Sequence, residues 1–266
     1  MLERPPGKPR AGFLQYQGDN MKIIKFIAVA VLCLAPLAAN ATPSTQVWIP
    51  STDIQKYKSV HLNVDNYVSS EQETAGTWKA PLLVIGPTIG VLPYEKVQAE
   101  VGFDLMRAGL AADSDPLYLH AKIGTPEGAA FAGSPAFALG GYNFGTKKDV
   151  TDQNIIYGLA AKNVGKLGRF SAGYYSGNDK VLVDENGDKE NTGVLLSWDR
   201  TISEVSDKLW AAVDYQGGDS ALGALSFGLA WAFTPDTSVI FGYDVYNNDK
   251  IAGANTYTVQ LDINLW

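Results

Sequence analysis

The sequence contains almost no cysteine, little histidine and no long apolar run, and each shortage excludes a class of protein. Cys33 is the only cysteine among 266 residues, so no disulfide within the chain can stabilise it as in small secreted domains. His61 and His120 are the only histidines, and no metal-ligand or haem spacing surrounds them. Neither lies in a recognisable catalytic motif. We therefore predict that the chain is not an enzyme and needs no metal or cofactor.

The most apolar stretch, residues 26–37, is about a dozen residues long, whereas a membrane-spanning helix needs roughly 20. It follows two basic residues, Lys22 and Lys25, and it precedes Ala39-Asn40-Ala41, a small-x-small cleavage pattern. This order predicts a signal peptide over residues 21–41, and the alternative is an uncleaved anchor helix. Because a signal peptide should begin its chain, we interpret residues 1–20 as an artefactual extension ahead of a true start at Met21.

Positive charge is also scarce once the predicted signal peptide is removed. Residues 42–266 keep 16 of the 21 basic residues and 26 of the 28 acidic ones, which gives a net charge of −10. A nucleic-acid partner is excluded because such proteins present a basic surface. An acidic balance instead suits solvated loops, and it would bias a pore toward cations.

What the sequence does contain is alternation of apolar and polar residues in segments of about ten residues. Side chains alternate across a strand, so each apolar stripe is one face of a sheet. The clearest examples are residues 96–106 and 256–265. The predicted strands are 59–68, 81–92, 96–107, 116–124, 135–145, 153–163, 168–183, 191–200, 207–217, 222–233, 237–246 and 254–266.

Twelve is an even number, which brings both ends of the chain to one side of a membrane, as single-chain bacterial barrels require. Short connections such as 93–95 and 234–236 alternate with longer acidic or amide-rich ones such as 69–80 and 184–190. Only the connection over 125–134 breaks this order. A soluble β-sandwich also alternates, but ten-residue strands exceed its usual strand length, and the polar stripes carry the Gly, Ser, Thr and amide residues that suit a lumen.

With a signal peptide, ten-residue strands and a terminal aromatic, the chain resembles Gram-negative outer-membrane β-barrel proteins of the porin-like kind over residues 59–266. The resemblance implies an all-β, transmembrane, up-and-down antiparallel barrel of about 12 strands in the outer membrane. It also implies that Trp266 is the C-terminal signal for the barrel assembly machinery. Trp266 follows Leu265, the last residue of the apolar stripe, whereas the usual pattern places the terminal aromatic within that stripe.

The side chains opposite the apolar stripes should face the lumen. A barrel of twelve strands lies between those of about eight, which side chains fill, and those of roughly sixteen, which hold an aqueous channel. The inward residues therefore predict either a mixed-charge constriction or an ion-paired network that fills the barrel. The lumen candidates are Glu100, Asp104, Tyr118, His120, Lys122, Asp214, Asp244, Gln260 and Asp262.

Two segments do not fit the strand pattern. Residues 42–58 form either a periplasmic lead-in or a small plug inside the barrel, and the lead-in is favoured. Residues 181–195 contain Asn186-Gly187 between alternating residues, which predicts a type I′ hairpin tip. A calcium loop is not supported there because Lys189 and Leu195 occupy positions that would need Gly and Glu.

From this pattern we expect a porin-like channel for the passive passage of small hydrophilic or amphipathic solutes. The alternatives are a closed structural or adhesive barrel that acts through its extracellular loops and, less favoured, an outer-membrane hydrolase that uses His61 or His120. The expected partners are outer-membrane lipid, the barrel assembly machinery and small solutes. The oligomeric state is left open.

Overall fold

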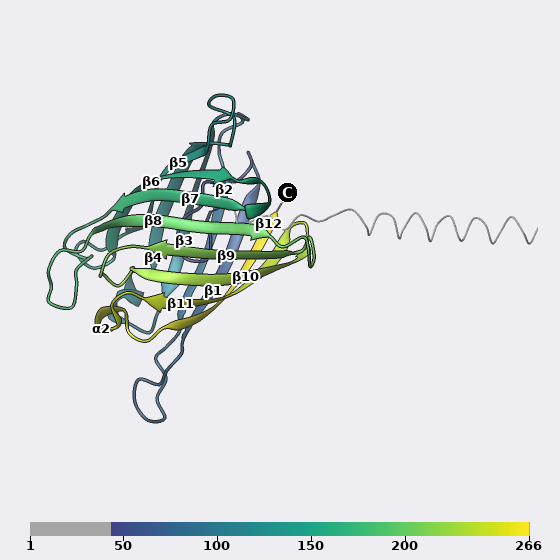
Figure 1. Ribbon diagram of the computed structural model, residues 1–266. Coiled ribbons are helices and arrows are strands. Elements are labelled where there is room, and N and C mark those ends of the chain that lie inside the picture. Colours follow the sequence, from purple (N-terminus) through teal and green to yellow (C-terminus); the bar gives the residue numbers. More distant parts are fainter. Residues whose placement is uncertain (1–43, 266) are drawn as a thin grey trace, which may run out of the picture. The chain divides into compact units, whose positions relative to one another are not determined.

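A computed structural model describes residues 44–265, which form a closed barrel of twelve strands (Figure 1). Each strand is antiparallel to its neighbours in the chain, and β12 pairs with β1 to close the sheet. The strands are β1 Val60–Ser69, β2 Leu82–Gly90, β3 Gln98–Arg107, β4 Leu117–Thr125, β5 Ala136–Gly145, β6 Asp152–Asn163, β7 Arg169–Ser176, β8 Thr192–Thr201, β9 Leu209–Gln216, β10 Ala224–Thr234, β11 Thr237–Tyr246 and β12 Thr256–Leu265.

The predicted fold class is confirmed, because the period-two alternation that defines the strands also gives each of them an inner and an outer face. In β10, for example, Ser226 and Ala230 are buried whereas Phe227 and Leu229 are exposed. A one-residue slip would exchange the two faces. The closing pair keeps one register from Val60↔Leu265 to Ser69↔Thr256. Among the described strands, no β-sheet edge is left unpaired, as a hydrocarbon environment demands.

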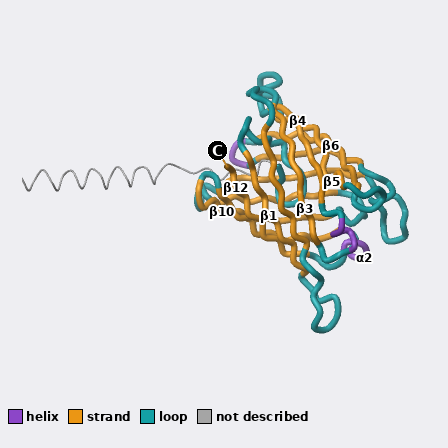
Figure 2. Tube along the Cα trace, turned by 180° about the vertical axis from the view of Figure 1, so that it is seen from behind, coloured by secondary structure: helices purple, strands orange, loops and turns teal. Residues whose placement is uncertain are grey.

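The two ends of the barrel differ. One end, here called the terminus end, carries the start of β1, the end of β12 and mostly short turns (Figure 1). The opposite end, here called the loop end, carries the longer connections together with the short helices η1 Ala111–Ser114 and α2 Asp249–Ala252 (Figure 2). A further short helix, η2 Gly165–Leu167, lies in a turn of the terminus end. The exception predicted at 125–134 persists, since residues 126–135 make a long connection at the terminus end.

Two local predictions are wrong. The strand predicted over 168–183 ends at Ser176, because Gly177 and Asn178 begin a turn in which the Leu182 amide bonds to the Asn178 carbonyl. The tip at Asn186-Gly187 is not type I′, since only Gly187 has a positive φ, of 82°. The Asp184 carboxylate accepts bonds from the amides of Asn186 and Asp188 and so holds a different turn.

Three predicted features lie outside the described residues, namely the extension 1–20, the signal peptide 21–41 and the terminal Trp266. Within residues 44–265, no helix has the length and apolarity needed to cross a bilayer.

Candidate functional site

Residues 44–58, here called the inner segment, lie inside the barrel. The segment enters beside β2, where the Lys58 amide bonds to the Gly90 carbonyl. Residues 44–51 double back as a tight hairpin with Val47 and Trp48 at its tip, closed by a bond from the Ser51 amide to the Ser44 carbonyl. Polar side chains predominate in this stretch, yet Gln46, Ser51 and Gln55 are buried.

The wall of β9–β12 holds the tip of the hairpin through its backbone. Asp214 Oδ2 accepts bonds from the amides of Val47 and Trp48, at 2.7 and 3.0 Å. Gln260 Nε2 donates to the Val47 carbonyl at 2.8 Å, and the indole of Trp48 donates to the Leu222 carbonyl at 2.9 Å. Asp214 is 0% exposed, so its bonds compensate for groups that water cannot reach.

Apolar packing fixes the same face of the hairpin. Val47 packs in one cluster with Trp210, Ala212, Ala230, Ala232 and Ile240, and Ile49 packs in a second. Gly228 is needed for this fit because a Cβ there would lie 2.5 Å from Val47 Cγ2. The second cluster, from β6–β8 and the loop after β7, is Ile155, Tyr157, Leu159, Tyr175, Leu182 and Leu195.

Two ionic groups hold the base of the inner segment. Glu100 Oε2 accepts the Gln55 amide at 2.6 Å, and its Oε1 accepts Ser44 Oγ at 2.9 Å and lies 3.2 Å from Lys122 Nζ. On the other side, Arg169 bridges Asp53 of the inner segment to Asp199 of β8, at 2.7 and 2.9 Å. These pairs bind a polar segment inside the barrel without leaving a bare charge.

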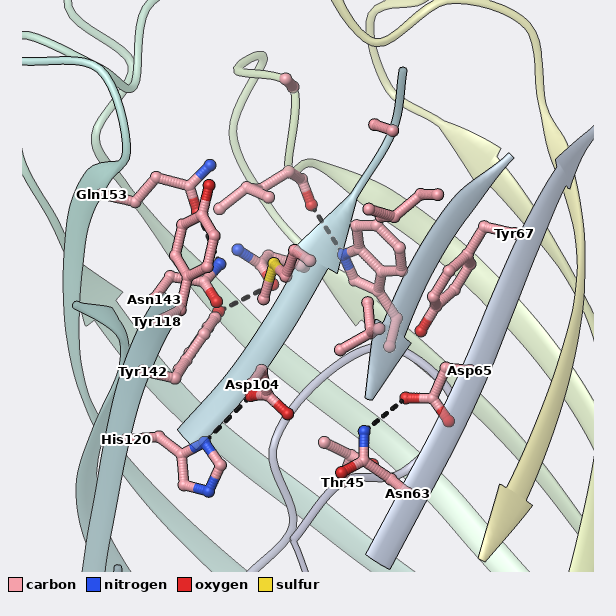
Figure 3. Close-up of a pocket in the computed structure, with 18 of the residues that line it drawn as sticks. Thr45, Asn63, Asp65, Tyr67, Asp104, Tyr118, His120, Tyr142, Asn143 and Gln153 are labelled. Atoms are coloured by element: carbon pink, nitrogen blue, oxygen red, sulfur yellow. Dashed lines mark hydrogen bonds and ion pairs between the residues drawn. The ribbon is translucent and has the colours of Figure 1, made fainter. Parts of the chain in front are cut away.

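A cavity of about 480 Å³ lies along β1–β5, beside the inner segment. It extends from Leu110 and Ile251 at the loop end to His61 and Glu100 in the terminus half. Its walls combine aromatic rings with carboxylate and amide groups (Figure 3). The lining residues used below are Trp48, Asn63, Asp65, Tyr67, Thr88, Asp104, Arg107, Tyr118, His120, Lys122, Tyr142 and Tyr246.

A hydrogen-bonded trio lies on the wall of this cavity. His120 Nδ1 is 3.0 Å from Asp104 Oδ2, and His120 Nε2 is 2.9 Å from Thr88 Oγ1. The ring reaches Thr88 across Gly102, where a Cβ would collide with Nε2. A hydroxyl, an imidazole and a carboxylate in this order also occur in hydrolases. Thr88, however, is only 1% exposed, and its hydroxyl is bonded to the imidazole. The trio therefore orients His120.

The structure distributes the nine lumen candidates over three places. Glu100, Asp104, Tyr118, His120 and Lys122 line the cavity, and Glu100 and Lys122 also hold the inner segment. Asp214 and Gln260 bind the hairpin tip. The remaining two bond to the wall itself, Asp244 to Thr256 at 2.9 Å and Asp262 to His61 at 3.3 Å.

Sequence reasoning missed Asp65 and the anchoring roles of Arg169 and Asp199. Asp65 lies on β1 in step with His61, Asn63 and Tyr67, all on the polar stripe, so the parity rule could have identified it. The role of Arg169 depends on Asp53, which is 116 residues away in the chain, and no local pattern reveals that contact. Among residues 44–265, no group of three or more His, Cys, Asp or Glu side chains could hold a metal ion.

The outer face of the barrel is an apolar belt that includes Phe103, Leu119, Leu139, Leu229 and Phe241, each more than a third exposed. Tyr243 and Tyr257 pair on this face, with ring centroids 4.9 Å apart, near the loop end. A closed barrel with such a belt and aromatic residues near its edge is the architecture of bacterial outer-membrane proteins. The chain is thus an outer-membrane β-barrel, as predicted.

No protein-family model matches the sequence, and no curated protein matches it either. Solved structures of similar fold include an outer membrane channel from Pseudomonas putida F1, with 9% identity over 79% of this chain and 96% of that one and a TM-score of 0.44. The NanC porin has 12% identity over 77% and 99% of the two chains, with a TM-score of 0.43. The KdgM porin has 8% identity over 78% and 99%, with a TM-score of 0.48. This likeness concerns the fold alone.

Proposed function

We propose that the protein is an outer-membrane channel for the passive passage of small hydrophilic or amphipathic solutes. The observation that carries this proposal is the shape of the cavity. It follows the β1–β5 wall from the loop end to Glu100 and Lys122, which lie beside the inner segment. Polar groups line the part of the cavity towards the terminus end, so a solute that enters at the loop end meets hydrogen-bonding partners along the path.

The inner segment is then the constriction of the channel. It occupies the β6–β12 side of the lumen, and its base crosses to Glu100 on β3 and Gly90 on β2. A solute must pass the contacts of Ser44, Gln55 and Lys122 to reach the terminus end. Wild-type conductance should therefore be small, and it should rise when the inner segment is displaced.

Planar-bilayer recordings of three proteins test this proposal. Wild type should give small discrete steps. Gly228→Val places a branched side chain where Val47 packs, so it should displace the inner segment and give steps several times larger. Gly158→Val is the matched control, because a Cβ on Gly158 meets no atom within 4 Å. Its steps should equal those of wild type.

Membranes that stay silent with all three proteins would reject the channel. They would support a closed barrel that acts through its extracellular loops. Equal steps from wild type and Gly228→Val, with correct folding shown by gel mobility before and after heating, would reject the inner segment as the constriction.

A further inference from the structure

From the chemistry of the cavity walls, we propose that the cavity binds small organic cations, namely ammonium compounds with an aromatic or aliphatic body. This inference rests on the proposed function in taking the cavity as the solute path, and it adds the class of solute. Three features of the wall carry it: an incompletely satisfied carboxylate, a group of aromatic rings next to it, and the distribution of charge along the cavity.

Asp65 is the carboxylate. Its side chain lies on the inner face of β1, and one oxygen accepts a bond from Asn63 Nδ2 at 3.1 Å (Figure 3). The other oxygen is buried and has no hydrogen-bond partner among the described residues. No Lys, Arg or His of the described part lies within 4.0 Å of this carboxylate, whereas Asp104, Asp262 and Glu100 each have such a partner. A carboxylate removed from water favours a cation that supplies N–H donors.

The aromatic group lies one step further along the same wall. Tyr67 follows Asp65 by two residues on the inner face of β1. Trp48 of the inner segment contacts the Tyr67 ring edge-on, with ring centroids 5.4 Å apart. Trp48 also contacts Tyr246 of β11 at 5.7 Å. Aromatic faces attract organic cations, and the apolar body of an amine can pack on the same rings. One ligand can thus meet Asp65 with its ammonium and the rings with its carbon skeleton.

The charge distribution agrees with this orientation. Asp104 faces the cavity from β3, on the same wall as Asp65 with β2 between them, and its carboxylate is bonded to the His120 ring (Figure 3). Three lining residues carry a permanent positive charge, and they lie towards the two ends of the cavity: Lys122 is paired with Glu100 towards the terminus end, Arg107 ends β3 at the loop end, and Lys79 lies in the connection between β1 and β2, also at the loop end. The middle of the cavity therefore carries two carboxylates and no Lys or Arg from the described chain. Its volume of about 480 Å³ lies within the range of small-molecule sites.

Binding in detergent solution tests the inference without requiring conduction. The probes are 2-phenylethylammonium, its neutral isostere 2-phenylethanol and the anion 3-phenylpropionate, measured by calorimetry on the full protein. We expect the ammonium probe to bind most tightly and the anion least. Asp65→Asn, which keeps the shape of the side chain, should weaken ammonium binding about tenfold to a hundredfold and leave 2-phenylethanol unchanged.

Asp262→Asn is the matched control, because Asp262 is also an inward carboxylate, opposite Asn63 in the β1–β12 pair, but it is bonded to His61 and does not line the cavity. Its ammonium affinity should equal that of wild type. Ammonium binding that is no tighter than alcohol binding, or that survives Asp65→Asn, would overturn the cation proposal. If either result were found together with conductance steps in bilayers, the cation proposal would be rejected and the proposed channel function would be kept. Silent bilayers with intact ammonium binding would reject the channel and keep the site.

Discussion

The two sides of the lumen are built from the same alternating strands, yet one is packed solid and the other is a cavity. On the packed side, β9 and β10 turn small residues inward, such as Ala212, Gly228 and Ala230, and the inner segment fills the room they leave. On the cavity side, β1 and β3 turn Asp65 and Asp104 inward, and both residues line the cavity. The content of a barrel this size thus depends on the volume and polarity of its inward residues.

This difference predicts that replacing an inward aspartate by alanine lowers the free energy of unfolding more on the packed side than on the cavity side. It is the largest effect we expect. Asp214→Ala leaves the buried amides of Val47 and Trp48 without an acceptor, at about 1–3 kcal/mol each. Asp104→Ala removes a partner of His120, where water in the cavity can take its place, so the loss should be about 1 kcal/mol.

Denaturant titration in detergent micelles gives both free energies of unfolding. Asp214→Ala should also enlarge the conductance steps, because it frees the hairpin tip, whereas Asp104→Ala should leave their size nearly unchanged. Equal losses of stability for the two variants would contradict the division of the lumen into a packed and an open side.

A second and smaller contrast separates an arginine inside the barrel from one outside it. Arg169 bridges Asp53 of the inner segment to Asp199, whereas Arg200 pairs with Glu204 at the exposed end of β8. Arg169→Gln should cost about 1.5–3 kcal/mol, since Asp199 is buried and loses its charged hydrogen-bond partner. Arg200→Gln should cost about 0–1 kcal/mol, as exposed pairs do. The same titration at low and at high salt distinguishes them, because salt should abolish only the Arg200 contribution.

The sequence was sufficient for the barrel, because a strand with one face in lipid and one in the lumen must alternate along its whole length. The number of strands and the inward parity of Glu100 or Asp214 follow from that constraint alone. The prediction fails where alternation continues beyond the strand: Val181 and Val183 keep the pattern, but the chain has already turned at Gly177. The local alternation therefore indicates which face a residue lies on better than where a strand ends.

The inner segment could not be derived in this way. Its backbone bonds to Asp214 and Gln260, which lie 167 and 213 residues away in the chain, and nothing in residues 44–58 indicates those contacts. The position of the cavity follows from the same long-range packing, since it lies where the inner segment does not. Parity places Asp65 in the lumen, but only the packing places it on the wall of the cavity.

The smallest expected effect concerns the loops above the cavity, where Glu185 joins the β7–β8 loop to α2. It accepts bonds from Asn248 and Lys250, and these bonds lower the pKa of Glu185 to about 2 from its usual 4.5. The bond to Glu185 raises the pKa of Lys250 above 10.5. Because the pKa of Glu185 is lowered, its charged form stabilises the contact fully above pH 4.5, and this stabilisation is lost as the pH falls towards 2. Because the pKa of Lys250 is raised, its charged form stabilises the contact fully below pH 10.5, and this stabilisation is lost at higher pH.

The contact should therefore be complete between about pH 5 and pH 10. Glu185→Gln should make Lys250 more reactive toward acetic anhydride at about pH 9, because more of its amine is then neutral. Mass spectrometry measures the acetylation rate, and Lys148, in the loop before β6, is the internal control. Since both groups of the pair are exposed, the variant should leave the stability of the barrel unchanged. A Lys250 rate that does not differ from wild type would show that the loops are not joined in solution. The open side of the lumen would then lack this bridge at its mouth.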